Sequence, residues 1–69
     1  MDKIDLHGIK HNEVEDVMIN ACHMYCVPFI VVTGNSKKMK KIVTDVVFKH
    51  FGLKARPSIS NDGCLVIEE

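Results

Sequence analysis

A carboxylate and an imidazole stand two residues apart near the start of the sequence, in the segment Asp5-Leu6-His7-Gly8. Alternate side chains of a strand share a face, so on a strand these two groups would project from the same side. A histidine titrates near neutral pH, and a neighbouring carboxylate can fix its tautomer and raise its basicity. Such a pair can accept the proton of a 2′-hydroxyl and donate one to a leaving oxygen. The simpler alternative is a structural role, because a histidine at a strand end is often only a hydrogen-bonding group.

A second group of residues, which comes after a later apolar run, has the features of a phosphate-binding turn. Gly34 permits a positive φ and a close approach of the backbone, and Asn35 also tolerates left-handed geometry. Ser36 can cap a following helix, whose free N–H groups and positive dipole end attract an anion. We expect phosphate contacts from the turn and the lysines after it: Thr33, Gly34, Asn35, Ser36, Lys37, Lys38, Lys40 and Lys41. The alternative is an ordinary strand-to-helix turn followed by solvated lysines.

The formal net charge is zero, but the charges are unevenly distributed along the chain. Residues 1–36 carry two lysines and five carboxylates, whereas residues 37–69 carry seven basic and four acidic side chains. We therefore expect a basic surface that binds nucleic acid through its phosphates, with Arg56 either extending it or simply solvated. The few aromatic residues fall mainly on positions predicted to be buried. Binding should thus involve little base stacking and little sequence preference.

Metal-dependent hydrolysis needs more ligands than the sequence offers in one place. Two-metal nucleases require several converging carboxylates, but the acidic residues other than Asp5 gather mainly near a helix start or the C-terminus. His11 comes next in the loop and could join Asp5 and His7, although a plain surface role fits it better. We expect no metal site and no cofactor. Cleavage of RNA, in which the 2′-hydroxyl is the internal nucleophile, needs only an acid and a base.

The scaffold for these residues can be predicted from the hydrophobic pattern of the first half of the chain. A short strand, Ile4-Asp5-Leu6, ends before Gly8. Asn12 and Glu15 have the spacing of a capping box, and apolar residues at helical spacing predict a helix over residues 13–24. The continuous apolar run over residues 29–32 is typical of a buried parallel strand.

The second half of the chain predicts a helix and then two strands. The helix runs from the Ser36 cap to the glycine-terminated end at Gly52. Residues 54–59 and 64–67 are the strands, and the Asn-Asp-Gly turn at 61–63 predicts a hairpin between them. Because βαβ crossovers are right-handed, both helices should cover one face of a mixed four-stranded sheet. The predicted fold is an α/β two-layer sandwich with the order β-α-β-α-β-β.

These motifs, in this order and spacing, resemble those of the Smr (small MutS-related) domain family. The family carries Leu-Asp-Leu-His-Gly at its first strand and Thr/His-Gly-x-Gly after its second. Here the two motifs stand as Ile4-Asp5-Leu6-His7-Gly8 and Thr33-Gly34-Asn35-Ser36, and the resemblance extends from Ile4 to Ile67. Ser36 replaces the second glycine of the turn, and lysines come after it where the family has further glycines. The resemblance implies a fold similar to the C-terminal domain of bacterial translation initiation factor three. It also implies nucleic-acid processing: several members nick DNA or cleave RNA, and others only bind.

Size and composition indicate one globular domain, residues 1–69, near the lower size limit for a self-sufficient core. Cys22, Cys26 and Cys64 form an odd set with no secretory signal before them, which favours free thiols in a reducing cytoplasm. No apolar stretch is long enough to span a membrane. The sequence does not indicate an oligomeric state.

We expect a nucleic-acid-binding endonuclease that nicks or cleaves structured DNA or RNA, with Asp5 and His7 as the catalytic pair. The first alternative is a non-catalytic module that uses the same turn to bind nucleic acid or a ribonucleoprotein. A third hypothesis is a small protein–protein adaptor in which Asp5 and His7 are only structural.

Overall fold

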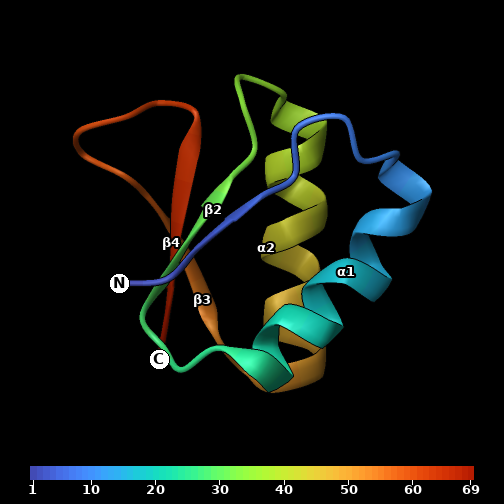
Figure 1. Cartoon of the computed structure of the whole chain (residues 1–69), viewed down its shortest axis with the longest axis vertical. Helices are drawn as coiled ribbons and strands as arrows, with labels where there is room; N and C mark the ends of the chain where they lie inside the picture. The colour runs from blue at the N-terminus through green and yellow to red at the C-terminus, as the bar shows by residue number, and fades with distance from the viewer.

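The computed structural model describes all residues, 1–69, and contains an open, mixed four-stranded sheet with two helices (Figure 1). The element order is the predicted β-α-β-α-β-β. The elements have these bounds: β1 Lys3–Asp5, α1 His11–Met24, β2 Phe29–Val32, α2 Lys37–Phe51, β3 Lys54–Pro57 and β4 Cys64–Glu68. Neither helix is long and apolar enough to cross a membrane.

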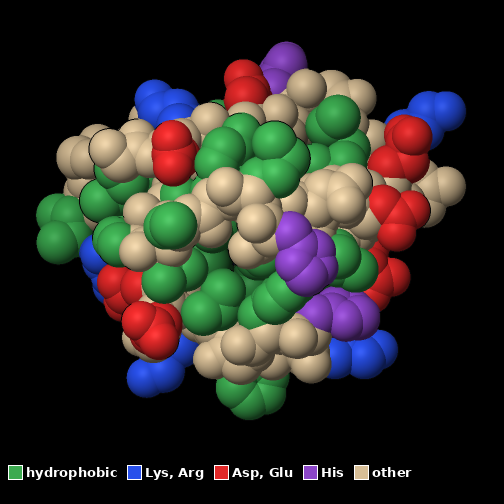
Figure 2. Space-filling view, turned by 60° about the horizontal axis from the view of Figure 1, so that its bottom comes forward, with side chains coloured by type: hydrophobic (Ala, Val, Ile, Leu, Met, Phe, Trp, Pro, Cys, Tyr) green, Lys and Arg blue, Asp and Glu red, His purple; other side chains and the backbone are tan.

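The strand order across the sheet is β1-β2-β4-β3. β1 and β2 are parallel, and β4 runs antiparallel to both β2 and β3. Both helices cover the same face of the sheet (Figure 1), so the predicted two-layer arrangement is confirmed. Their C-terminal ends lie at the bottom of Figure 1, and Figure 2 turns this end of the molecule toward the viewer.

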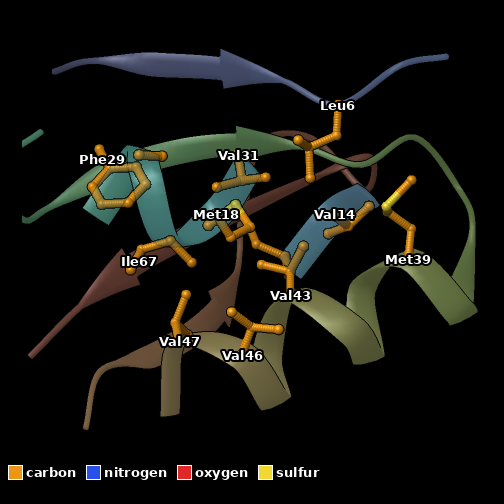
Figure 3. Packing of buried hydrophobic residues seen from close by; sticks show 12 residues of the cluster. Leu6, Val14, Met18, Phe29, Val31, Met39, Val43, Val46, Val47 and Ile67 are labelled. Atoms are coloured by element: carbon orange, nitrogen blue, oxygen red, sulfur yellow. The ribbon is translucent and has the colours of Figure 1, made fainter. Parts of the chain in front are cut away.

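The core lies between the sheet and the helices (Figure 3). Phe29 and Val31 of β2 and Ile67 of β4 are fully buried on the helix side, as the period of two in a strand requires. They pack against apolar side chains at helical spacing on the two helices: Val14, Met18, Ala21, Met39, Val43, Val46 and Val47. Leu6, the first residue after β1, is also fully buried and anchors the end of that strand in the core.

The two ends of α2 are capped as predicted. The Ser36 side chain accepts a hydrogen bond from the Met39 N–H at 3.1 Å, the usual bond of a serine N-cap. Gly52 ends the helix with φ 67°, a left-handed conformation in which glycine carries no steric penalty. The cap geometry therefore fixes where the lysine-rich segment begins.

The prediction for the start of α1 is wrong. The helix begins at His11, its N-cap residue is Lys10, and no side chain caps it. The chain turns earlier than expected because the Ile9 N–H donates to the Leu6 carbonyl at 3.0 Å, directly after the buried leucine. Asn12 consequently lies inside the first helical turn and cannot act as the cap.

Candidate nucleic-acid interface

The carboxyl ends of β1 and β2 lie side by side. Asp5 is in register with Val32, and the Leu6 N–H donates to the Val32 carbonyl at 2.9 Å. The turns that leave these strands, together with the β3–β4 loop, lie at the top of Figure 1. We call this region, residues 6–10, 33–36 and 58–63, the loop end. The two motif-bearing turns therefore follow neighbouring strands.

The Asp5 carboxylate does not pair with the His7 imidazole. Instead, Asp5 Oδ1 accepts a hydrogen bond from the His7 backbone N–H at 2.8 Å, which closes a local turn. The strand ends at Asp5 and Gly8 has φ 83°, so the alternation of side chains expected of a strand does not extend through this segment. Both side chains are exposed on either side of buried Leu6. The His7 ring has no hydrogen-bond partner within the chain, which leaves both ring nitrogens free for a ligand.

Thr33 has a structural role. It is only 6% exposed, and its hydroxyl donates to the Gly34 carbonyl at 3.0 Å or the Gly63 carbonyl at 3.3 Å. The backbone N–H groups of Thr33 and Gly34 also donate to the Gly63 carbonyl, at 2.8 and 3.0 Å. Gly34 has the expected positive φ, 66°. These groups tie the turn to the β3–β4 loop and are therefore not free to bind a phosphate.

The anion-binding groups that remain are at the first two residues of α2. Ser36 uses its side chain on the Met39 N–H, and Asn35 is exposed beside it. The backbone N–H groups of Lys37 and Lys38 have no acceptor within the chain. Such groups, at the positive end of a helix dipole, bind anions readily.

The four lysines of this segment are not equivalent. Lys37 and Lys38 are exposed and have no acidic partner. Lys41 forms an exposed ion pair with Asp45 at 3.2 Å, one helical turn later. Lys40 is partly buried, and its ammonium donates to the carbonyl of Asp62 in the β3–β4 loop. Lys37 and Lys38 are thus the cations most available to a phosphate.

The structure does not bring Arg56 to these lysines. Arg56 lies on β3, at the opposite edge of the sheet from β1, and its Nε is 3.2 Å from Glu68 Oε2. Lys10, which sequence reasoning did not select, lies at the loop end as the exposed N-cap residue of α1. Only its position directly after the first motif could have indicated this. His11 was expected in the loop after Gly8. It is instead the exposed first residue of α1.

The aromatic side chains are mainly buried or partly buried, as expected, with one exception. Phe29 is buried and Tyr25 and Phe51 are partly buried, but the Phe48 side chain is 69% exposed. Phe48 lies 11 positions after Lys37 in the same helix, which is about 16 Å along the axis. It therefore does not contribute a stacking surface to the loop end.

No three or more His, Cys, Asp or Glu residues are grouped so that they could hold a metal ion. Comparison with family models, with curated proteins and with solved structures found no match for this chain. The fold and the geometry of the loop end are therefore the observations that bear on function.

Proposed function

We propose that this chain is an Smr-like domain that binds structured RNA or DNA at its loop end and cleaves the phosphodiester backbone there. The main support is that a group suited to proton transfer and groups suited to phosphate binding lie at the same end of the molecule. An exposed, unpartnered imidazole at His7 and the lysine-rich start of α2 come directly after neighbouring parallel strands. Phosphodiester cleavage needs both kinds of group, one for proton transfer and one for the phosphate charge.

Phosphate binding would depend mainly on Lys37 and Lys38. Their ammonium groups have no acidic partner, and their backbone N–H groups point out of the first turn of α2 without acceptors. Lys40 and Lys41 already have partners within the chain, so each would contribute less. Contacts of this kind position a nucleic acid and carry little sequence information.

Cleavage of RNA fits these residues better than metal-dependent hydrolysis. His7 would take the proton of a 2′-hydroxyl, whose oxygen then attacks the adjacent phosphorus. The bond from phosphorus to the 5′-oxygen breaks, and the leaving oxygen is protonated, which gives a 2′,3′-cyclic phosphate and a 5′-hydroxyl. Asp5 acts as a positioning residue, because its carboxylate holds the turn that carries the imidazole.

One observation favours the non-catalytic alternative. The Asp5 carboxylate is bonded to the backbone, so it does not polarise the His7 ring, and the expected acid–base pair is not formed in the free protein. A binding module would use the same lysines without proton transfer. Wild-type protein that binds structured RNA but leaves it intact at every pH would establish this alternative.

The deciding experiment is cleavage of a labelled structured RNA by wild type and His7→Ala, in chelator. We expect cleavage by the wild type, a cyclic phosphate end, and loss of cleavage in His7→Ala with binding retained. Activity abolished by chelator and restored by a divalent ion would contradict the mechanism, as would full activity of His7→Ala. Supercoiled DNA, assayed in parallel, would show whether the chain also nicks a substrate that lacks the 2′-hydroxyl.

Binding itself is tested by its salt dependence. Lys37→Gln combined with Lys38→Gln should lower the slope of log K against log salt by about one for each lost phosphate contact. Lys49→Gln is the matched control, because Lys49 is an exposed lysine in the last turn of the same helix. Binding that does not depend on salt would favour the protein–protein adaptor.

We further infer that the chain works in the cytoplasm. All three cysteines are free, and two of them are at least partly accessible, which suits a reducing compartment. A nucleic-acid substrate agrees with that location.

A further inference from the structure

The end of the molecule opposite the loop end is rich in exposed apolar side chains. α1 ends there at Met24, and the chain has no Lys, Arg, Asp or Glu from Ile19 to Pro28, which covers the last part of α1 and the turn before β2. In Figure 2, apolar side chains cover much of this end and two histidines lie among them. Most of the charged side chains in that view lie near its margin. Exposed apolar side chains that gather on one face of a protein often mark an interaction site.

Specific contacts link the side chains of this surface across the two helices. The Met24 side chain is 74% exposed and comes directly after His23, whose ring lies edge-on to Phe51 with centroids 5.3 Å apart. Phe51 lies three residues after Phe48, so the two residues occupy neighbouring positions on the surface of α2. Cys26 and Pro28 are exposed just beyond the end of α1. We call this surface the apolar pole, with the residues His23, Met24, Cys26, Pro28, Phe48 and Phe51.

Charged residues of both signs lie close to the apolar pole. Lys54 and Glu68 are in register at the ends of β3 and β4 where the helices also finish. Lys49 lies in the last turn of α2, and Glu69 is the residue after Glu68. The formal net charge of the whole chain is zero. Glu68 already pairs with Arg56 of its own chain, so a second copy, rotated by a two-fold axis, would place Lys49 or Lys54 opposite Glu69.

We propose that the apolar pole is the contact surface of a homodimer. The size of the chain favours a second copy as the partner. With 69 residues and only 16 of them buried, the core is small, and the free cysteines provide no disulfide to supplement it. Association with a second copy is one of the ways in which a domain with a small core gains further apolar burial. A nucleic acid would not bind here, because its phosphates need cations that this surface lacks at its centre.

The test is sedimentation velocity of the full chain over a wide range of concentration, up to millimolar. We expect the wild type to pass reversibly from the 7.8 kDa monomer to a dimer. Met24→Lys should weaken the dimer by at least about tenfold, because a charge would be buried in the contact. Ile59→Lys is the matched control: Ile59 is an equally apolar side chain, 96% exposed, but lies at the loop end, so dimerisation should not change.

A second measurement, chemical cross-linking of the wild type, does not use the Met24→Lys variant. A short bifunctional maleimide should join two copies through the exposed thiol of Cys26, and Cys26→Ser should abolish that product. Circular dichroism checks that Met24→Lys remains folded. A wild type that is monomeric at every concentration would overturn the proposal, as would equal dimerisation of Met24→Lys and wild type.

Discussion

The turn after β1 and the turn after β2 each connect a strand to the following helix, but different kinds of hydrogen bond hold them in place. The turn after β2 is fixed by long-range contacts, because Thr33 and Gly34 bond to Gly63, which is 30 and 29 residues away. The turn after β1 begins with a long-range bond from the Leu6 N–H to Val32, but residues 7–10 form only local bonds, such as that from the His7 N–H to Asp5. The comparison suggests a rigid turn before the lysine-rich start of α2, beside a more adjustable turn that carries the imidazole.

The largest effect is expected from a substitution in the turn after β1. It should lower the cleavage activity and leave the stability unchanged. His7→Ala should lower RNA cleavage by about 10²–10⁴-fold, the usual contribution of a general acid or base. The free energy of unfolding should change little, since the exposed ring has no partner within the chain. Single-turnover cleavage and urea unfolding of the same preparation measure both quantities. A large loss of stability would show that the first turn is more than locally held.

The next largest effect should be a difference in the free energy of unfolding between variants of the two turns. A Cβ at Gly63 would lie 3.3 Å from the Gly34 Cα, so Gly63→Ala must push two backbone segments apart. We expect a loss of about 1–3 kcal/mol in the free energy of unfolding. Asp5→Ala, which removes one exposed local hydrogen bond, should cost only about 0.5–1 kcal/mol. Equal losses in chemical unfolding would remove the distinction between the turns.

Substitutions at the two helix N-caps should change the stability in opposite directions: one should lower it and the other should raise it. Ser36→Ala removes the only side-chain cap of α2 and should cost about 1 kcal/mol. Lys10→Ser adds a capping hydroxyl to α1, whose N-cap residue already has the extended backbone that a cap requires, φ −69° and ψ 145°. It should therefore stabilise the protein by up to about 1 kcal/mol, measured by thermal unfolding. No gain from Lys10→Ser would mean that the first turn holds α1 in a geometry unsuited to a side-chain cap.

The smallest effect is expected from a contact between α1 and α2, away from the two turns. His50 Nε2 lies 2.9 Å from Glu15 Oε2, and the hydrogen bond from His50 lowers the pKa of Glu15. A lowered pKa stabilises the folded state above the unfolded-state pKa of glutamate, and this stabilisation is lost as the pH falls through the folded-state value. Stability measured across acidic pH should therefore fall less steeply in Glu15→Gln than in wild type. Because both side chains are solvent-accessible, the difference should be small and should decrease with salt.

Local patterns predicted most of the fold. The apolar periodicity indicated the order of the elements, and the Ser36 cap and the Gly52 end of α2 depend only on neighbouring residues. Parallel pairing of β1 and β2 was expected from the handedness of a short crossover, so the adjacency of the two turns was also predictable. These features need no knowledge of distant contacts.

The details of the candidate site were less predictable because they depend on where a strand ends or on distant residues. The expected pairing of Asp5 with His7 assumed a strand that continues to residue 7, but β1 stops at Asp5. The Thr33 hydroxyl is occupied by Gly63, whose position is set by the β3–β4 hairpin. Phe48 is exposed although Val46 and Val47, directly before it in α2, are buried. Composition alone does not show this.

The close contact between Gly34 and Gly63 has a consequence for anyone who wishes to transfer the turn to another protein. A peptide containing Thr33 to Lys38 would carry the motif but not the carbonyl of Gly63 that fixes its backbone. The geometry of this turn therefore does not depend on a single continuous segment of the sequence. It would have to be grafted as two segments from distant parts of the chain, with both glycines retained so that the segments can approach.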